Sequence, residues 1–168
     1  MSSSLPDPSR LPEDALEWHP LVLTTEKIRS LWEKFQKFPI AFDDFTKGDM
    51  DHFIAGLMDR NSVFFEIGDE LGLAAATAIR PRLDAFVHLI MFDLRLRGRE
   101  DLFKNMIRYV VDEFALRRIS AAVPENRGAA GALLKRLGFT EEGTLRKAFM
   151  SDGGYLDIKL FGILREEL

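Results

Sequence analysis

The sequence contains no cysteine, so disulfides, thiolate metal sites and a cysteine nucleophile are all excluded. Histidine is scarce, and the wide separation of His19, His52 and His88 argues against a zinc site, so we expect no bound metal. No apolar run is long enough to cross a bilayer, and the first 19 residues lack the apolar core of a signal peptide. A net charge of −4 gives no basic excess. We therefore expect a cytoplasmic protein whose partners are neither membranes nor nucleic acids.

The rest of the composition is that of one globular domain, with 168 residues of which 46% are hydrophobic and 30% charged. A chain of this length can bury roughly 70% of its unfolded surface, which is enough for a substantial core. Residues 1–19 differ, because three prolines and a short serine run make a composition that does not fold alone. We expect either a disordered tail or an arm that docks on a partner, followed by a domain over residues 20–168. The apolar anchors of such an arm are Leu5, Leu11, Leu16 and Trp18.

Residues 84–139 organise the predicted fold. Ala85–Phe92 is apolar except at His88, which predicts a central strand buried on both faces. An amphipathic helix follows, then a short strand at Ile119–Val123 and a second helix at Asn126–Leu137. The apolar stripe of the first helix is Leu102, Phe103, Met106, Ile107, Val110, Val111 and Phe114. A strand–helix–strand unit of this length predicts two adjacent parallel strands joined by a right-handed crossover.

The flanking segments complete an α/β domain. Their patterns predict two helices before the central unit and strands on both sides of it. The expected helices are Thr25–Phe38, capped by Thr24 or Thr25, and Met50–Met58; the expected strands are Leu21–Thr24, Ser62–Ile67, Leu71–Ile79, Thr144–Met150 and Tyr155–Leu164. The order is β-α-α-β-β-β-α-β-α-β-β. Short turns between most strands predict a mixed, mostly antiparallel sheet with two central parallel strands.

Three stretches of the chain carry a resemblance to a known family: RLRGRE, NRGAAGALLKRLGF with the following EEGTLR, and GGYLDIKLFGIL. In order and spacing, residues 20–168 resemble the GCN5-related N-acetyltransferase (GNAT) family, nearest to the branch that acetylates protein N-termini, including those of ribosomal proteins. The RLRGRE turn is also similar to divergent members encoded in bacteriophage genomes. The resemblance implies the GNAT fold, acetyl-coenzyme A as a substrate and an amine as the acceptor.

The family's pyrophosphate loop has the form Arg/Gln-x-x-Gly-x-Gly/Ala. Arg97 matches the first position, whereas Glu100 and Leu102 stand where the family has small residues that let phosphate approach the backbone. Acidic side chains at a helix N-terminus also compete with pyrophosphate for the positive end of the helix dipole. Arginine side chains can bind phosphate instead. The residues expected to hold the pyrophosphate are Arg95, Arg97, Gly98 and Arg99.

Two residues are candidates for the general base. His88 lies in the strand that, in the family, runs beside the thioester, where an imidazole can take a proton from a substrate ammonium. The alternative is a neutral, hydrogen-bonded histidine of the core. Glu66, on the next strand along the sheet, is the second candidate, with a solvated surface carboxylate as its alternative.

The last helix offers no general acid. Many relatives place a tyrosine a few residues before the Gly-Phe pair to protonate the leaving thiolate, and Leu134 occupies that position here. Asn126 matches the family's asparagine before this helix, either as a contact with the coenzyme or as the helix N-cap. Residues 128–132 are glycine and alanine only, which suits close packing of a pantetheine arm or of another helix.

Two functions of different classes follow from these residues. The first is an N-acetyltransferase that transfers the acetyl group of acetyl-coenzyme A to a primary amine, such as a protein N-terminus. The second is a GNAT-fold protein without catalysis that serves as a binding or assembly module. Glu100 and Leu134 favour the module, whereas the intact element order and the arginine triplet favour the enzyme. A homo-oligomer, or a protein partner bound through the N-terminal arm, is compatible with both.

Overall fold

The structure is a computed structural model that describes residues 16–37, 49–151 and 153–168. Its elements follow the expected order, with two short 3₁₀ turns added at Leu94–Leu96 and Arg165–Glu167. The helices are α1 (Thr25–Lys37), α2 (Met50–Leu57), α3 (Glu100–Glu113) and α4 (Gly128–Leu137). The strands are β1 (Trp18–Pro20), β2 (Val63–Ile67), β3 (Gly72–Arg80), β4 (Asp84–Met91), β5 (Arg118–Pro124), β6 (Thr140–Ser151) and β7 (Gly154–Leu164). No helix in these ranges is long and apolar enough to cross a membrane.

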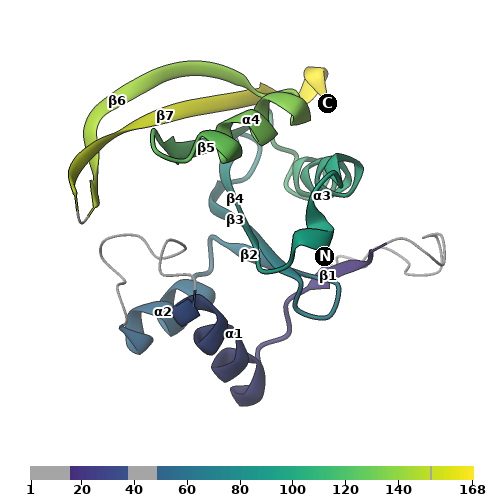
Figure 1. Cartoon of the computed structure of the whole chain (residues 1–168). Helices are drawn as coiled ribbons and strands as arrows, with labels where there is room; N and C mark the ends of the chain where they lie inside the picture. Colours follow the sequence, from purple (N-terminus) through teal and green to yellow (C-terminus); the bar gives the residue numbers. More distant parts are fainter. Residues whose placement is uncertain (1–15, 38–48, 152) are drawn as a thin grey trace.

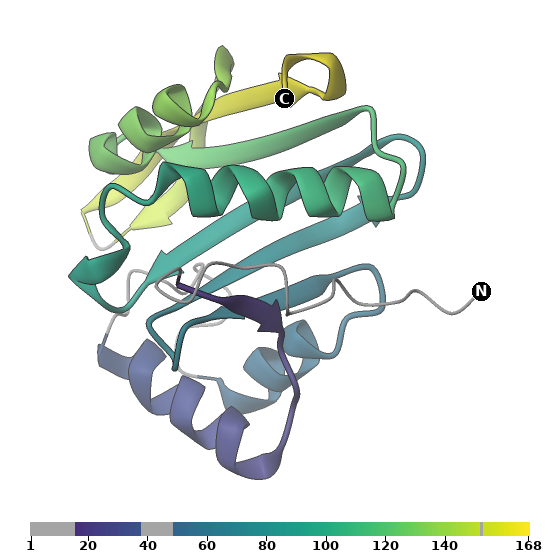
Figure 2. The same ribbon diagram turned by 90° about the vertical axis from the view of Figure 1, so that its right-hand side faces the viewer.

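The described strands form one sheet in the order β1-β2-β3-β4-β5-β7-β6. Strands β4 and β5 are adjacent and parallel, and every other neighbouring pair is antiparallel. This confirms the prediction of two central parallel strands in a mostly antiparallel sheet. The right-handed crossover rule explains why α3 then lies across the sheet between them (Figure 2).

Helices cover both faces of the sheet (Figures 1 and 2). Helices α3 and α4 share the larger apolar core with the sheet, and the apolar stripe of α3 is buried as its spacing predicts. Helices α1 and α2 pack on the opposite face in a smaller core that includes Leu73 of β3. The long β6–β7 hairpin curves toward the side on which α1 and α2 lie (Figure 1). We call this side of the sheet the α1/α2 face.

The first strand lies earlier than expected. It spans Trp18–Pro20 and pairs with β2, whereas the predicted strand at Leu21–Thr24 is not formed. The reason is aromatic packing, because the Trp18 ring lies 5.3 Å from that of Phe65 and 5.1 Å from that of Tyr109. Trp18, expected as an anchor for a partner, thus packs on its own domain. The anchors Leu5 and Leu11 lie outside the described residues.

Strand β4 is not buried on both faces, so that part of the sequence prediction is wrong. Ala85 is buried, but the residues after it are half-buried or exposed, and His88 is among the exposed ones. The physical reason is the short ladder with β5, which ends at the pair Phe86↔Ser120. The second half of β4 therefore has no paired neighbour on its β5 side, and its apolar residues line an opening in the molecule instead.

Candidate active site

A cleft lies beside the second half of β4, where the ladder with β5 has ended. Its floor is formed by Ala74–Ala76 of β3 and Val87–Leu89 of β4, and its walls come from α3 and α4. The wall residues include Phe103, Met106, Ile107, Val110, Leu133, Leu134 and Leu137. The cleft exists because two parallel strands separate in the middle of the sheet while both helices stay packed over the gap.

The lining of the cleft is that of a small-molecule site, which is mostly apolar with a few polar groups. Among the described residues that line it, His88 alone has a polar side chain. An apolar channel with one titratable group at its edge suits a ligand with a long apolar portion and a reacting end.

His88 lies where the cleft meets the α1/α2 face. Alternation along β4 places it on the same face as Ile90, which packs against the core of α1 and α2. The His88 Nε2 and Thr77 Oγ1 atoms are 2.9 Å apart. The imidazole is therefore hydrogen-bonded, as the alternative interpretation required, but it is exposed and does not belong to the core.

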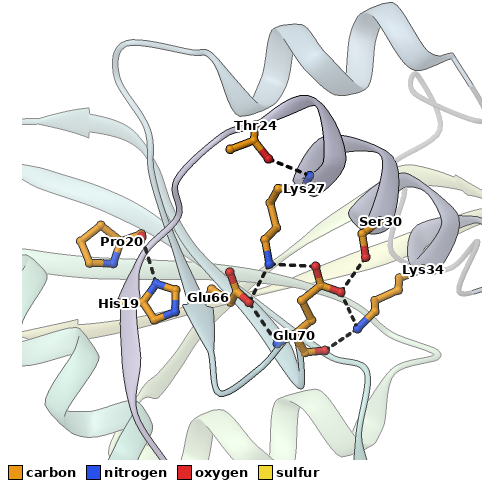
Figure 3. Close-up of polar contacts among 8 residues, drawn as sticks. All are labelled: His19, Pro20, Thr24, Lys27, Ser30, Lys34, Glu66 and Glu70. Atoms are coloured by element: carbon orange, nitrogen blue, oxygen red, sulfur yellow. Dashed lines mark hydrogen bonds and ion pairs between the residues drawn. The ribbon is translucent and has the colours of Figure 1, made fainter.

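Glu66 is buried and is not the solvated surface carboxylate that the sequence analysis considered as an alternative. Its side chain is 5% exposed, points to the α1/α2 face and forms a 2.9 Å ion pair with Lys27 of α1 (Figure 3). Glu66 Oε1 also accepts a hydrogen bond from the Glu70 backbone N–H. Glu66 and His88 lie on β2 and β4, with β3 between them, so the structure does not bring the two candidate bases together.

The ion pair of Glu66 is part of a network that fastens α1 to the β2–β3 turn (Figure 3). Glu70 receives hydrogen bonds from Lys27 Nζ at 2.8 Å and from Ser30 Oγ at 2.6 Å, and its backbone carbonyl accepts one from Lys34. Burial alone would raise the pKa of Glu70, but the hydrogen bonds from Lys27, Ser30 and Lys34 outweigh it and lower that pKa to about 2. The carboxylate therefore stays ionised at neutral pH.

The expected pyrophosphate loop leads into the N-terminus of α3. Gly98 has a left-handed backbone with φ +75°, and a Cβ built there would meet no atom within 4 Å. Arg97 is exposed, and the Arg99 guanidinium lies only loosely against Asp101, with 3.7 Å between Nε and Oδ1. Arg95 differs, because its guanidinium bonds back to Asp93 at 3.0 and 2.9 Å.

Glu100 occupies the N-terminus of α3, where the loop backbone would meet a phosphate. Its Oε1 accepts a 2.7 Å hydrogen bond from Arg136 Nε in the last turn of α4. This bond, together with one to its own backbone N–H, lowers the pKa of the Glu100 carboxyl. The ion pair joins the first turn of α3 to the last turn of α4, and these two helices form the walls of the apolar cleft.

The start of α4 differs from the prediction. The helix begins at Gly128 rather than Asn126, and its N-cap is Arg127, which makes no capping bond with its side chain. Asn126 is exposed and is not the N-cap. The Arg127 guanidinium packs 5.8 Å from the centre of the Phe149 ring. Its Nε is buried without a hydrogen-bond partner among the described residues, and burial lowers its pKa.

The backbone of the cleft suits an amide-containing ligand. Beyond Phe86 and Ser120, the facing edges of β4 and β5 carry N–H and C=O groups that no ladder between these strands uses. An extended ligand can satisfy such groups as an added strand does. Leu134, which the sequence analysis placed at the position of the family's tyrosine, lines the same cleft from α4 and supplies no hydroxyl.

Sequence reasoning missed Thr77 and Arg136. Thr77 pairs directly with Phe86, so on the shared face it lies diagonal to His88, two residues along β4. Finding it requires the register of the β3–β4 hairpin, which the turn sequence alone does not fix because β3 contains a bulge. Arg136 had a visible signal, since a basic residue in the last turn of a helix is favoured there. The pairing of Arg136 with Glu100 could not be predicted from the sequence, because it depends on how α3 packs against α4.

The element order, the sheet and the gap between two central parallel strands define the fold as that of the GCN5-related N-acetyltransferases. No protein-family model and no curated protein matches the sequence. The fold similarity is instead seen in solved structures, at sequence identities that are too low to show more than the fold.

Three of these structures illustrate the similarity. Spermidine N-acetyltransferase from Vibrio cholerae, solved in complex with CoA and spermine, matches with a TM-score of 0.70 and 19% identity over 89% of this chain and 96% of that one. A dodecameric structure of spermidine N-acetyltransferase from the same organism, in an intermediate state, matches with a TM-score of 0.69 and 20% identity over 90% of this chain and 94% of that one. An acetyltransferase of unproven activity from Acinetobacter baylyi matches with a TM-score of 0.71 and 16% identity over 92% of this chain and 95% of that one.

Proposed function

We propose that this protein is an N-acetyltransferase that moves the acetyl group of acetyl-coenzyme A to a primary amine. The observation that carries the proposal is the cleft beside the open half of β4, which is apolar along its length and ends at His88. A thioester on a long, partly apolar arm fits such a channel, and the reacting end then lies next to a titratable group. The structure of Vibrio cholerae spermidine N-acetyltransferase with CoA and spermine, which has a similar fold, supports this proposal.

The substrate's pantetheine arm would lie between β4 and β5, with its amides bonded to the unpaired strand edges. Its pyrophosphate would lie at the N-terminus of α3, held by the Arg97 and Arg99 side chains and the loop around Gly98. Arg95 contributes less, because its guanidinium is already engaged by Asp93. A β4 backbone N–H that faces the cleft can donate to the thioester oxygen as negative charge develops on it.

His88 would act as the general base. The acceptor amine is an ammonium ion in neutral solution and must lose a proton before its nitrogen can attack the thioester carbon. An exposed imidazole at the edge of the cleft can take that proton, after which the C–N bond forms and the C–S bond breaks. Leu134 cannot protonate the departing thiolate, so the thiolate leaves as the anion or takes a proton from solvent. Glu66 is the weaker candidate, because Lys27 already holds its carboxylate.

The acceptor is an amine that reaches the cleft from the α1/α2 face. A protein N-terminus, expected from the sequence, and a polyamine, the ligand in the structure with spermine, are the two chemistries to compare. A homo-oligomer and a cytoplasmic location stay predictions, as does coenzyme contact from Asn126.

The test is acetyl transfer by the purified chain, followed as thiol release from acetyl-coenzyme A and by mass spectrometry of the amine. We expect turnover with spermidine or with peptides bearing a free N-terminus, and a fall in kcat of about a hundredfold in His88→Ala, the usual contribution of a general base. His52→Ala is the matched control, because His52 lies at the exposed start of α2 and should leave kcat unchanged. Equal kcat values in both variants would remove His88 from the mechanism.

One specific feature favours the second function, a binding module without catalysis. The Glu100 carboxylate already occupies the positive end of α3 and pairs with Arg136, as a bound anion would. If that arrangement persists in solution, acetyl-coenzyme A neither binds nor reacts. Absence of turnover with every amine, together with absence of coenzyme binding, would establish the module and end the enzyme proposal.

A further inference from the structure

Arg127 is a partly buried cation that lacks a counter-ion among the described residues. It follows β5, which ends at Pro124, and it is the N-cap of α4. Its Nε atom is buried without a hydrogen-bond partner there, and burial is the sole cause of the shift that lowers its pKa. Burying a charge without a partner is unfavourable. The residue as a whole is half-buried, so part of it stays open to solvent and to a ligand.

The aromatic contact of Arg127 places its guanidinium on the α1/α2 face. The guanidinium lies over the ring of Phe149, which pairs with Leu156 of β7. Phe161 of β7 is buried in the core under α3 and α4, so alternation puts Leu156 and Phe149 on the opposite face. His88 lies on that face as well. The opening between β4 and β5 is thus bordered by His88 on β4 and by Arg127 beyond the end of β5.

The acidic side chains on this face of the sheet are already paired. Among the described strands, each acid whose sequence neighbours are buried in the larger core points to the α1/α2 face and is held by a basic residue. The pairs are Glu66 with Lys27, Asp84 with Arg80, and Glu142 with Arg118. Arg127 therefore adds a positive charge that these strands do not balance. A polyamine meets repulsion at such a site, whereas an acceptor with a carboxylate completes an ion pair.

We propose that Arg127 selects the acceptor by binding a carboxylate that the acceptor carries near its reacting amine. The proposal rests on the proposed acetyl transfer and names its substrate class. The preferred acceptor is a primary amine with a carboxylate, such as a peptide N-terminus followed by an acidic residue, and not a polyamine. A guanidinium over an aromatic ring keeps the N–H groups at its edge for a carboxylate, which it binds through two parallel hydrogen bonds. The amine end of the acceptor then faces His88 across the opening.

The first test compares acceptors that differ only in charge. Short amidated peptides with a free N-terminus and a Glu at the second or third position are set against the same peptides with Gln, and against spermidine. We expect kcat/KM to be at least about tenfold higher for the Glu peptides than for the Gln peptides or spermidine, because charge-assisted hydrogen bonds are the stronger kind. Equal values for the two sets of peptides, or a preference for spermidine, would overturn the proposal.

The second test uses matched variants. Arg127→Gln should abolish the preference by raising the KM for the Glu peptides, with the KM for acetyl-coenzyme A unchanged. Arg127→Lys keeps the charge without the paired donors and should keep part of the preference, which provides a second variant if Arg127→Gln does not fold. Arg117→Gln is the control, because Arg117 is exposed just before β5, at the opposite end of the strand. A raised KM for acetyl-coenzyme A with the preference intact would mean that Arg127 binds the coenzyme's phosphates, and would overturn the proposal.

A binding measurement separates failure of this inference from failure of the proposed function. The Nε–H resonance of Arg127, identified by its loss in Arg127→Gln, should shift on titration with the Glu peptides and not with the Gln peptides. If no amine is acetylated at all, the proposed function fails, and this resonance alone then decides whether Arg127 binds a carboxylate. A resonance that responds to neither set of peptides, or equally to both, would overturn the inference.

Discussion

Glu100 and Arg136 connect the first turn of α3 to the last turn of α4 through a hydrogen-bonded ion pair of 2.7 Å. The pair lies where the family's loop presents bare backbone to a pyrophosphate. The structure therefore shows that Glu100, which the sequence analysis identified as unfavourable for pyrophosphate binding, is paired with Arg136. Opening the pair would release both the helix N-terminus and an arginine for the coenzyme.

Replacing Glu100 with Gln should strengthen acetyl-coenzyme A binding by about three- to tenfold, because it removes a negative charge beside the pyrophosphate and frees Arg136. The melting temperature should fall slightly, since the ion pair and an acidic residue at the helix N-terminus are lost. Glu113→Gln is the control, because Glu113 is an exposed acid at the other end of α3. Calorimetric titration measures the affinities. A weaker affinity in Glu100→Gln would mean that this side chain helps to bind the ligand.

Neutralising Arg97 and Arg99 together to Gln should weaken acetyl-coenzyme A binding by well over tenfold, because charge-assisted hydrogen bonds contribute roughly 1.5–3 kcal/mol each. Arg95→Gln should have a smaller effect, since Asp93 already holds the Arg95 guanidinium. The comparison is made by titration at low and moderate salt. An unchanged affinity in the double variant would place the phosphates elsewhere.

Part of the fold could be predicted from the sequence alone. Apolar runs and helical spacing were sufficient for the element order and for the parallel pair of β4 and β5. The positions of the first strand and of the α4 N-terminus were missed, because aromatic packing of Trp18 and the backbone around Arg127 decided them. The opening in the sheet was also missed, since an apolar strand such as β4 reads the same whether it faces a core or an apolar cleft.

The role of His88 in the candidate site stays a prediction. The sequence showed it as a polar residue in an apolar strand, and the structure places it at the cleft, but its contact with Thr77 depends on the bulge in β3. Glu66 was weighed against a solvated surface residue, whereas the structure buries it with Lys27, a residue 39 positions earlier in the chain. Long-range ion pairs of this kind leave no local trace in a sequence.

The Glu70 network predicts a specific acid response. The folded-state pKa of Glu70 is about 2, below its ordinary value of 4.5, so its stabilising contribution is complete above 4.5 and disappears as the pH falls toward 2. Glu70→Gln should lower the free energy of unfolding by roughly 1–2 kcal/mol at pH 7, after allowance for solvent screening, and by progressively less below pH 4.

Denaturant unfolding over this pH range measures the difference between Glu70→Gln and the unmodified protein. Asp69→Asn serves as the control, because Asp69 is exposed in the same turn and should show no such dependence. A stability difference for Glu70→Gln that stays constant from pH 7 to pH 2.5 would mean that the network does not depend on the ionised carboxylate.

Calorimetric titration of the unmodified protein with acetyl-coenzyme A, beside a variant whose cleft is filled, tests the account most directly. Leu134→Trp places a larger ring in the cleft, and Leu145→Trp makes the same change at an exposed position of β6. We expect saturable binding of one molecule per chain to the unmodified protein and to Leu145→Trp, and a loss of at least about tenfold in Leu134→Trp, because a filled cleft excludes the pantetheine arm. No binding to the unmodified protein at millimolar ligand, or equal binding to both variants, would contradict the proposed coenzyme site.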